Sequence, residues 1–397
     1  MAMATVTALS RASATSDGWW VKPCAIFGSD LAPNVLLMAK LIVLAFLLQS
    51  NLPLSSHFLP FVPIFERMGS PETFHALLVA VFLCGSAALF FNWRVREASL
   101  VLGTTILISI LASRPTYSNN LAYCGALLFM IGLQGPGEPR LLRLQVAMLY
   151  FGAGMNKLLD PDWRSGQFFE YWFGHRRENG WYLRIGTYVP ELLFSKLVSW
   201  LSFSTELALS AMLLMRRCYP FAIWVGLALH TGMLVLTNLT FQMFYFAACA
   251  SFLAFVTWPR ERMIVLYDGN CGRCTRARRF FEAVDLEHRV DWVGFDEPES
   301  RRFDLHDPPL RDTVHLLVGE KRHSGFAAFR TLLLYNPLTY FALVVILRSP
   351  DVLYLRRWIA LSALLLFSPF TIPLGELLYR RFRHQPSYTA SAVFAPR

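Results

Sequence analysis

Two cysteines in the C-terminal part of the chain have the spacing of a dithiol that exchanges with disulfides. Residues 263–274 read MIVLYDGNCGRC, which predicts a β-branched strand, a Gly/Asn turn and a helix that opens with Cys271 and Cys274. Both thiols then lie on the first helical turn, where exposed backbone N–H groups and the helix dipole stabilise a thiolate. Arg273 and Arg276 add positive charge nearby. Disulfide exchange needs this arrangement, because one sulfur attacks and the second resolves the mixed disulfide.

The same pair could instead be half of a zinc site, or chemically inert. Zinc generally takes four protein ligands, and the sequence holds no second pair of closely spaced cysteines. Four histidines lie downstream but are not spaced as a ligand pair: His288, His306, His315 and His323. The remaining cysteines are scattered, as small buried apolar residues are: Cys24, Cys84, Cys124, Cys218 and Cys249. The pattern therefore favours redox chemistry and predicts no bound metal.

Three ionisable residues in or beside apolar runs form a second candidate site. Lys157 ends an apolar helix whose small residues 152–154 allow close helix packing. A partly desolvated ammonium gives up its proton more readily and can serve as a base, although Lys157 could equally extend to the membrane interface as an anchor. His230 lies within an apolar run, where an ionisable group is costly and often functional, but a hydrogen bond to another helix would explain it as well. Glu206 could pair with either residue.

The composition is that of a membrane protein. Hydrophobic residues make up 55% of the chain and charged residues only 16%, which excludes an ordinary soluble protein. The net charge of +10 comes from short basic clusters between apolar runs, so the lipid bilayer, and not nucleic acid, is the expected partner. Eight stretches approach the roughly 20 residues that a membrane helix needs: 33–50, 72–92, 98–113, 119–135, 141–157, 191–215, 219–238 and 241–257.

Basic residues in the short loops set the expected orientation in the membrane. Arg94, Arg140 and Arg216 fall on the same side as the N-terminus, which is then cytoplasmic. An even number of spans returns the chain to the cytoplasm before residue 263, so the dithiol faces a reducing compartment. We therefore expect an integral protein of the bacterial inner membrane with a cytoplasmic N-terminus and a cytoplasmic CxxC domain. This placement favours a reductase or redox-sensing role over disulfide formation.

After residue 258 an α/β pattern replaces the long apolar runs. The expected elements are strands 263–267, 289–294 and 313–318, helix 272–285, an acidic loop 296–312 and an apolar helix after Gly325. Two later apolar stretches, 338–347 and 358–378, are expected to be interfacial helices, with a ninth membrane span as the alternative for the second. The expected domains are thus an N-terminal segment 1–29, a membrane domain 30–258 and a small domain 259–397.

Residues 263–383 resemble the DCC family (DUF393) of thiol-disulfide oxidoreductases, which is named for an Asp-x-x-Cys-x-x-Cys pattern. Here the pattern reads Asp268, Cys271 and Cys274. The resemblance implies a thioredoxin-like fold, with Cys271 as the attacking thiol and Cys274 as the resolving thiol. Asp268 would accept a proton or hold the turn. The implied partner is a thiol-containing protein or a small-molecule redox compound; neither of two neighbouring prolines, Pro308 and Pro309, can be assigned as the cis-proline of thioredoxin.

Residues 30–258 resemble the HTTM domain, the transmembrane region shared with vitamin K-dependent γ-carboxylase. The resemblance centres on residues 150–166, which read YFGAGMNKLLDPDWRSG, and on His230 in its apolar run. In the carboxylase, a lysine matching Lys157 deprotonates vitamin K hydroquinone, and the histidine matching His230 lies in the same site. The resemblance therefore implies a quinone, hydroquinone or lipid-like ligand. The carboxylase also has a large lumenal portion that recognises its protein substrate, and we recognise nothing comparable here, so γ-carboxylation of proteins is not expected.

Together these features predict a polytopic α-helical membrane bundle of about eight transmembrane helices followed by a small thioredoxin-like α/β domain. The expected function is that of an enzyme, a membrane-bound thiol–disulfide oxidoreductase, whose bundle binds a quinone or a lipid-like ligand. One alternative is a non-enzymatic membrane protein in which the dithiol is a redox switch or a metal clip. The other is a carboxylase-like or transferase-like membrane enzyme that uses Lys157.

Overall fold

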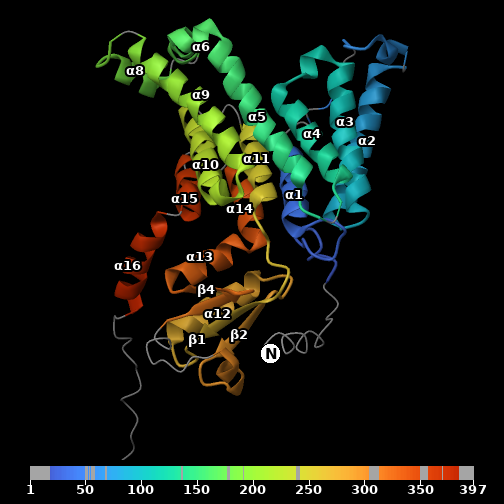
Figure 1. Ribbon diagram of the computed structural model, residues 1–397. Helices are drawn as coiled ribbons and strands as arrows, with labels where there is room; N and C mark the ends of the chain where they lie inside the picture. The colour runs from blue at the N-terminus through green and yellow to red at the C-terminus, as the bar shows by residue number, and fades with distance from the viewer. Residues whose placement is uncertain are drawn as a thin grey trace, which may run out of the picture. The chain divides into compact units, whose positions relative to one another are not determined.

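The computed structural model describes residues 18–383 apart from gaps at 50–51, 53, 55–58, 68, 136, 177–178, 191, 238–241, 304–312, 349–355 and 369 (Figure 1). The chain divides into two compact units. The first contains Met1–Trp258 and Tyr340–Arg357, and the second contains Pro259–Thr339 and Trp358–Arg397. Residues 340–357 thus cluster with the first unit, although they follow the sheet of the second unit in the sequence.

The described part of the first unit is helical. Its elements are α1 (Pro33–Leu47), η2 (Pro63–Arg67), α2 (Pro71–Phe90), α3 (Val95–Ala112), η3 (Arg114–Thr116), α4 (Asn119–Leu133), α5 (Arg140–Leu159), α6 (Pro161–Ser165), α7 (Gln167–Phe169), η4 (Glu170–Arg176), α8 (Gly180–Gly186), α9 (Leu193–Leu214), η5 (Arg216–Cys218), α10 (Tyr219–Leu236), α11 (Gln242–Ser251), η6 (Phe252–Phe255) and most of α14 (Pro337–Arg348). Helix starts follow local signals. Proline stands in the first turn of α1, α2 and α10, and Ser70 and Ser118 cap α2 and α4.

Glycines allow the closest helix contacts in this unit. Helix α3 packs between α2 and α4, α5 packs against α9, and α10 packs against α9 and α11 (Figure 1). A Cβ on Gly103 of α3 would lie 2.4 Å from the backbone nitrogen of Phe129 in α4. A Cβ on Gly154 of α5 would lie 2.8 Å from Leu207 of α9. Small residues therefore let these backbones approach, as the sequence predicted for α5.

Among the described residues, four helical segments are long and apolar enough to cross a membrane: α2, α3, α9 and Arg216–Leu236. The number rises to six if two bent helix pairs each count as one span. The expected count of about eight is therefore not confirmed. Each of the eight predicted apolar stretches contains a helix in its described part, but α1 and α4 have only 15 residues each and α11 has 10. A helix of 15 residues rises about 22 Å, less than the roughly 30 Å of a hydrocarbon core.

The second unit is a small α/β domain. Its elements are β1 (Met263–Tyr267), α12 (Gly272–Val284), β2 (Val290–Gly294), η7 (Pro298–Phe303), β3 (His315–Val318), β4 (Lys321–Ser324), α13 (Phe326–Leu334), most of α15 (Arg356–Phe367) and α16 (Thr371–Arg383). The strands form one sheet in the order β2-β1-β3-β4. Strand β1 is parallel to β2 and antiparallel to β3, and β3 is antiparallel to β4.

The strands predicted near 263–267, 289–294 and 313–318 and the helices predicted at 272–285 and after Gly325 are confirmed, but β4 was missed. The predicted loop 296–312 contains η7, and its residues 304–312 lie outside the described part of the chain. Strand β4 reads Lys-Arg-His-Ser and carries no apolar alternation. It lies at the edge of the sheet, where a polar strand is tolerated, and pairs with β3 through a turn in which Gly319 has a φ of +57°. The sequence could not reveal it because its place is set by the turn and not by burial.

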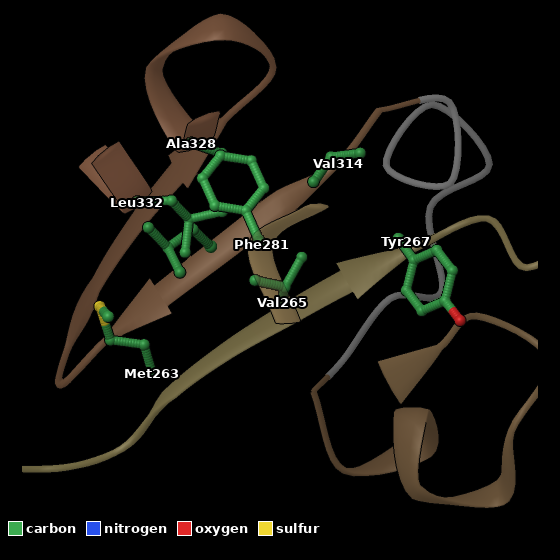
Figure 2. Packing of buried hydrophobic residues seen from close by; sticks show 8 residues of the cluster. Met263, Val265, Tyr267, Phe281, Val314, Ala328 and Leu332 are labelled. Carbon is green, nitrogen blue, oxygen red and sulfur yellow. The ribbon is translucent and has the colours of Figure 1, made fainter. Parts of the chain in front are cut away.

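The core of the sheet positions the dithiol helix. Met263, Val265 and Tyr267 alternate along β1 and belong to one buried cluster with Phe281 of α12 and Leu332 of α13, and Val265 lies beside Phe281 (Figure 2). The opposite face carries a separate cluster around Leu266 and Phe295. Since β1 leads directly into α12, the end of a buried strand fixes where the helix begins.

Candidate functional site

The turn between β1 and α12 is held by Asp268. Its backbone oxygen accepts the N–H of Cys271 at 3.2 Å, and its carboxylate Oδ1 accepts the N–H of Asn270 at 2.9 Å. The Asn270 side chain donates in turn to Asp296 Oδ2 at 3.2 Å. The geometry corresponds to the turn-holding role, one of the two roles expected for Asp268.

The two sulfurs sit differently at the start of α12. Cys271 is the N-cap residue with an extended backbone, and its Sγ accepts the N–H of Cys274 at 3.3 Å. Cys274 is partly buried and packs against the core of the sheet. One sulfur therefore receives a backbone N–H at the partly exposed helix start, and the other lies against apolar side chains.

The nearby arginines take up separate positions along α12. Arg273 and Arg276 are exposed, and Arg276 Nε donates to the carbonyl of Gly272 at 3.3 Å. Arg278 binds the hydroxyl of Tyr267 at 2.5 Å and Glu282 at 2.7 Å. The positive charge near the dithiol thus comes from Arg273 and Arg276, because Arg278 is bound to Tyr267 and Glu282 further along the helix.

A metal bound by the dithiol would need further ligands, and the described part of the chain places no cluster of them there. No group of three or more His, Cys, Asp or Glu side chains there is arranged to hold an ion. His315, one of the four downstream histidines, lies 2.8 Å through Nδ1 from the hydroxyl of Ser324. His306, Pro308 and Pro309 lie outside the described residues.

Lys157 and Glu206, from the second candidate site, form a partly buried ion pair. The Lys157 ammonium at the end of α5 contacts Glu206 of α9, and their side chains are 18% and 6% exposed. The ammonium also lies 4.9 Å from the ring centre of Trp163. Among the described residues, Glu206 Oε2 has no hydrogen-bond partner. Of the two partners that the sequence allowed for Glu206, Lys157 and His230, the structure pairs it with Lys157.

His230 forms a different pair, with Tyr150. The Tyr150 hydroxyl lies 2.6 Å from His230 Nε2, and the ring of His230 contacts Phe244 edge-on. His230 is 3% exposed, and its Nδ1 has no partner in the described part of the structure. We did not single out Tyr150 from the sequence. The available signal was its spacing, seven residues before Lys157 and therefore on the same face of α5.

Lys157 lines a cavity of about 950 Å³ within the first unit. The wall comes from α4, α5, α9, α10 and the aromatic segment that follows α5, including Trp163, Phe168, Phe169, Trp172 and Phe173. Gly152 and Ala153 also face the cavity, whereas Gly154 faces Leu207. The three small residues therefore have two different uses, to leave open space and to allow helix contact. In the described chain, Glu206 and His230 are not among the lining residues.

Comparison with protein families matches both parts of the chain. A model of the HTTM domain matches residues 138–258, and a model of the DCC1-like thiol-disulfide oxidoreductase matches residues 265–360. An HTTM domain precedes a DCC1-like domain. The two resemblances drawn from the sequence are thereby confirmed over the matched residues. No curated protein and no solved structure matches the chain.

The two matches cover the two candidate sites. Lys157, Glu206 and His230 lie in the HTTM domain, and Cys271 and Cys274 lie in the DCC1-like domain. Several apolar helices accompany them in the described residues. In general terms, the chain is therefore a membrane redox protein.

Proposed function

We propose that this chain is a membrane-bound thiol–disulfide oxidoreductase that works through Cys271 and Cys274. The main support is that the two sulfurs lie in different surroundings, Cys271 at the N-cap of α12 and Cys274 against the core. A thiolate at Cys271 would receive the N–H of Cys274, 3.3 Å away, together with the positive end of the α12 dipole. Cys271 is therefore the attacking sulfur. Cys274 packs on the core three residues later and is the resolving sulfur.

The exchange proceeds in two steps, formation of a mixed disulfide and its resolution. The Cys271 thiolate attacks one sulfur of a partner disulfide, forms a mixed disulfide and releases the other partner sulfur as a thiolate. Cys274, as a thiolate, then attacks the sulfur of Cys271, closes the intramolecular disulfide and releases the second partner thiolate. Two electrons have then passed to the partner. A thiol compound must reduce the pair again, and Asp268 holds the turn that presents Cys271 throughout.

Insulin reduction by the full chain in nanodiscs, with dithiothreitol as the electron donor, tests this proposal. We expect Cys271→Ser to abolish reduction and Cys274→Ser to accumulate a mixed disulfide, because attack survives but resolution does not. Cys84→Ser is the matched control, since Cys84 is exposed on α2 in the other unit. Undiminished reduction by Cys271→Ser would refute the assignment.

We extend the proposal to fold and topology. The order β2-β1-β3-β4, with β3 antiparallel to its neighbours and α12 and α13 on one face, supports a thioredoxin-like domain in the region 259–397. The helical stretches α1–α5 and α9–α11 would supply eight spans for a membrane domain over 30–258. That number would leave the N-terminus and the dithiol in the cytoplasm, with a thiol-containing partner.

The cavity beside Lys157 supports a second proposal, that the HTTM domain binds a quinone or a lipid-like molecule. Its volume of about 950 Å³ and its largely apolar and aromatic wall suit a ring with an apolar tail. Lys157 would bind the polar end of the ligand, and Trp163 would contact its ring. A bound hydroquinone would supply reducing equivalents. Because Glu206 pairs with the Lys157 ammonium, Lys157 can serve as a base only after its proton has left.

Thermal stabilisation of the full chain by a short-chain ubiquinone measures this binding. We expect Lys157→Met to weaken the stabilisation, because the cavity loses its cationic end. Lys196→Met is the control, since Lys196 is exposed on α9 and outside the cavity wall. Equal stabilisation of both variants would count against a ligand at Lys157.

A further inference from the structure

Helices α15 and α16 expose an apolar surface that a water-soluble domain would bury. Its seven large side chains range from 36% exposed at Leu361 to 69% exposed at Trp358. The set is Trp358, Leu361, Leu365, Phe370, Leu374, Leu377 and Leu378. Trp358, Leu361 and Leu365 are spaced three and four apart on α15, and Leu377 and Leu378 lie three and four residues after Leu374 on α16, so each helix carries one stripe. Phe370 lies directly before α16. A patch of this kind marks a contact with a membrane or with another protein.

The opposite side of α16 is already used to bind the sheet domain. A Cβ on Gly375 would lie 2.2 Å from the ring of Phe326, so helix and ring are in direct contact. Glu376 Oε2 accepts the N–H of Phe326 at 3.0 Å, which caps the start of α13. The hydroxyl of Thr313 donates to Tyr379 at 3.3 Å. The exposed stripe is therefore the second face of a helix whose first face is occupied.

Helix α13 holds α15 in a complementary way. Arg330 Nε donates to the carbonyl of Leu366 at 2.7 Å, and its Nη2 donates to the carbonyl of Phe367 at 2.9 Å. These carbonyls lie at the end of α15, where no helical N–H can reach them. Arg330 of α13 thus binds the end of α15, and Glu376 of α16 binds the start of α13, so two contacts of opposite charge clamp the helix pair to α13. Both helices are thus attached to the sheet domain by hydrogen bonds.

The charge around the stripe indicates what covers it. Arg380 and Arg381 are exposed directly after Leu377 and Leu378, and Arg380 Nε also pairs with Glu376 Oε1 at 3.4 Å. An apolar stripe bordered by arginines is typical of a helix that lies in the headgroup region of a bilayer. Guanidinium groups bind phosphate in a bidentate manner, and anionic lipids attract basic residues near the surface.

We propose that α15 and α16 lie in the headgroup layer of a bilayer that contains anionic lipids, and that the Arg330 and Glu376 clamps hold the dithiol domain to this anchor. The contact continues toward the dithiol helix. The ring of Tyr379 lies 6.1 Å from Phe329, which stacks on Phe281 of α12 at 6.0 Å. The anchor therefore fixes the orientation of Cys271 to the lipid surface. The proposal does not depend on the redox activity of the dithiol.

Photocrosslinking of the full chain in nanodiscs tests the anchor. Lipids carry a diazirine either next to the headgroup or at the end of the acyl chain, in discs of phosphatidylcholine with or without phosphatidylglycerol. We expect the shallow probe to label residues 358–381, and phosphatidylglycerol to increase this label. Each arginine at an anionic surface is worth about a fivefold preference, so Arg381→Glu should lower the label in anionic discs by about fivefold or more. Arg380 is left unchanged because it pairs with Glu376.

Lys321→Glu is the matched control, because Lys321 is an exposed cation of the same domain outside the anchor and should leave the label unchanged. Cysteine alkylation rates verify that each variant keeps its dithiol domain folded. Three outcomes overturn the proposal. Stronger labelling by the deep probe would mean that the helices span the bilayer. The absence of label would mean that protein or water covers the stripe. Equal label in neutral and anionic discs would remove the role of the arginines.

Discussion

The ion pair between Lys157 and Glu206 allows a quantitative test of what holds the HTTM domain together. Glu206→Leu leaves the Lys157 ammonium without its partner in a site where the two side chains are only 18% and 6% exposed. Removal of one partner from a buried pair costs about 3–5 kcal/mol. The stem of Lys157 can lift its ammonium partly toward water, so we expect the lower end, about 3 kcal/mol. The double variant Lys157→Met with Glu206→Leu leaves no buried charge and should cost about 1 kcal/mol or less.

The assay is equilibrium unfolding of the full chain in a fixed lipid–detergent mixture. A loss of about 3 kcal/mol raises the unfolding constant more than a hundredfold, which such a measurement resolves. Lys196→Met, a change at an exposed lysine of α9, should have almost no effect and controls for the loss of positive charge. If Glu206→Leu costs less than about 1 kcal/mol, or if the double variant costs the sum of the single ones, the pair is not a coupled buried unit and the reasoning fails.

Three further predictions concern stability. Lys40 is fully buried, and its ammonium lies 2.7–3.2 Å from four backbone carbonyl oxygens that share its three N–H groups, so Lys40→Met should lower the free energy of unfolding by about 3 kcal/mol, measured by the same unfolding assay. Gly154→Ala places a Cβ against Leu207 and should cost about 1–3 kcal/mol, whereas Gly152→Ala meets nothing within 4 Å and should be neutral; melting temperatures of the pair decide this. Burial lowers the pKa of His323, and positive neighbours lower it further. The folded domain therefore keeps this imidazole neutral, its stability is complete above the ordinary pKa of about 6.5, and it falls as the pH decreases below that value. Comparison with His323→Gln across this range should show a smaller loss of stability on acidification in the variant.

The sheet domain could be predicted from sequence wherever burial leaves a pattern. Met263, Val265 and Tyr267 alternate because one face of β1 is buried, and the Gly/Asn turn and the dithiol helix follow from local signals. Strand β4 lacks such a pattern, since it is an exposed edge held by a turn. The contacts of Arg330 and Glu376 also leave no pattern in the sequence, because each joins residues that are 36 or more positions apart in the chain.

The candidate sites were predictable as residue types but not as pairs. Lys157, Glu206 and His230 attract notice because ionisable groups are rare in apolar runs. Their partners depend on how α5 crosses α9 and α10, and no spacing along the chain specifies that crossing. In the structure, Lys157 pairs with Glu206, and His230 pairs with Tyr150. For the dithiol, both cysteines lie within one helical turn, so local geometry sufficed to anticipate their arrangement.

The aromatic wall of the cavity has a practical consequence. Trp163 and Trp172 both line it, so the protein carries its own fluorophores at the place where a molecule would enter. Because Trp163 already stacks 4.2 Å from Phe168 and lies beside the Lys157 ammonium, its emission responds to displacement of either neighbour. The difference between the emission of the intact chain and that of Trp163→Phe isolates this signal from the other tryptophans. Entry into the cavity can thus be followed optically, without a labelled compound and before any reaction is known.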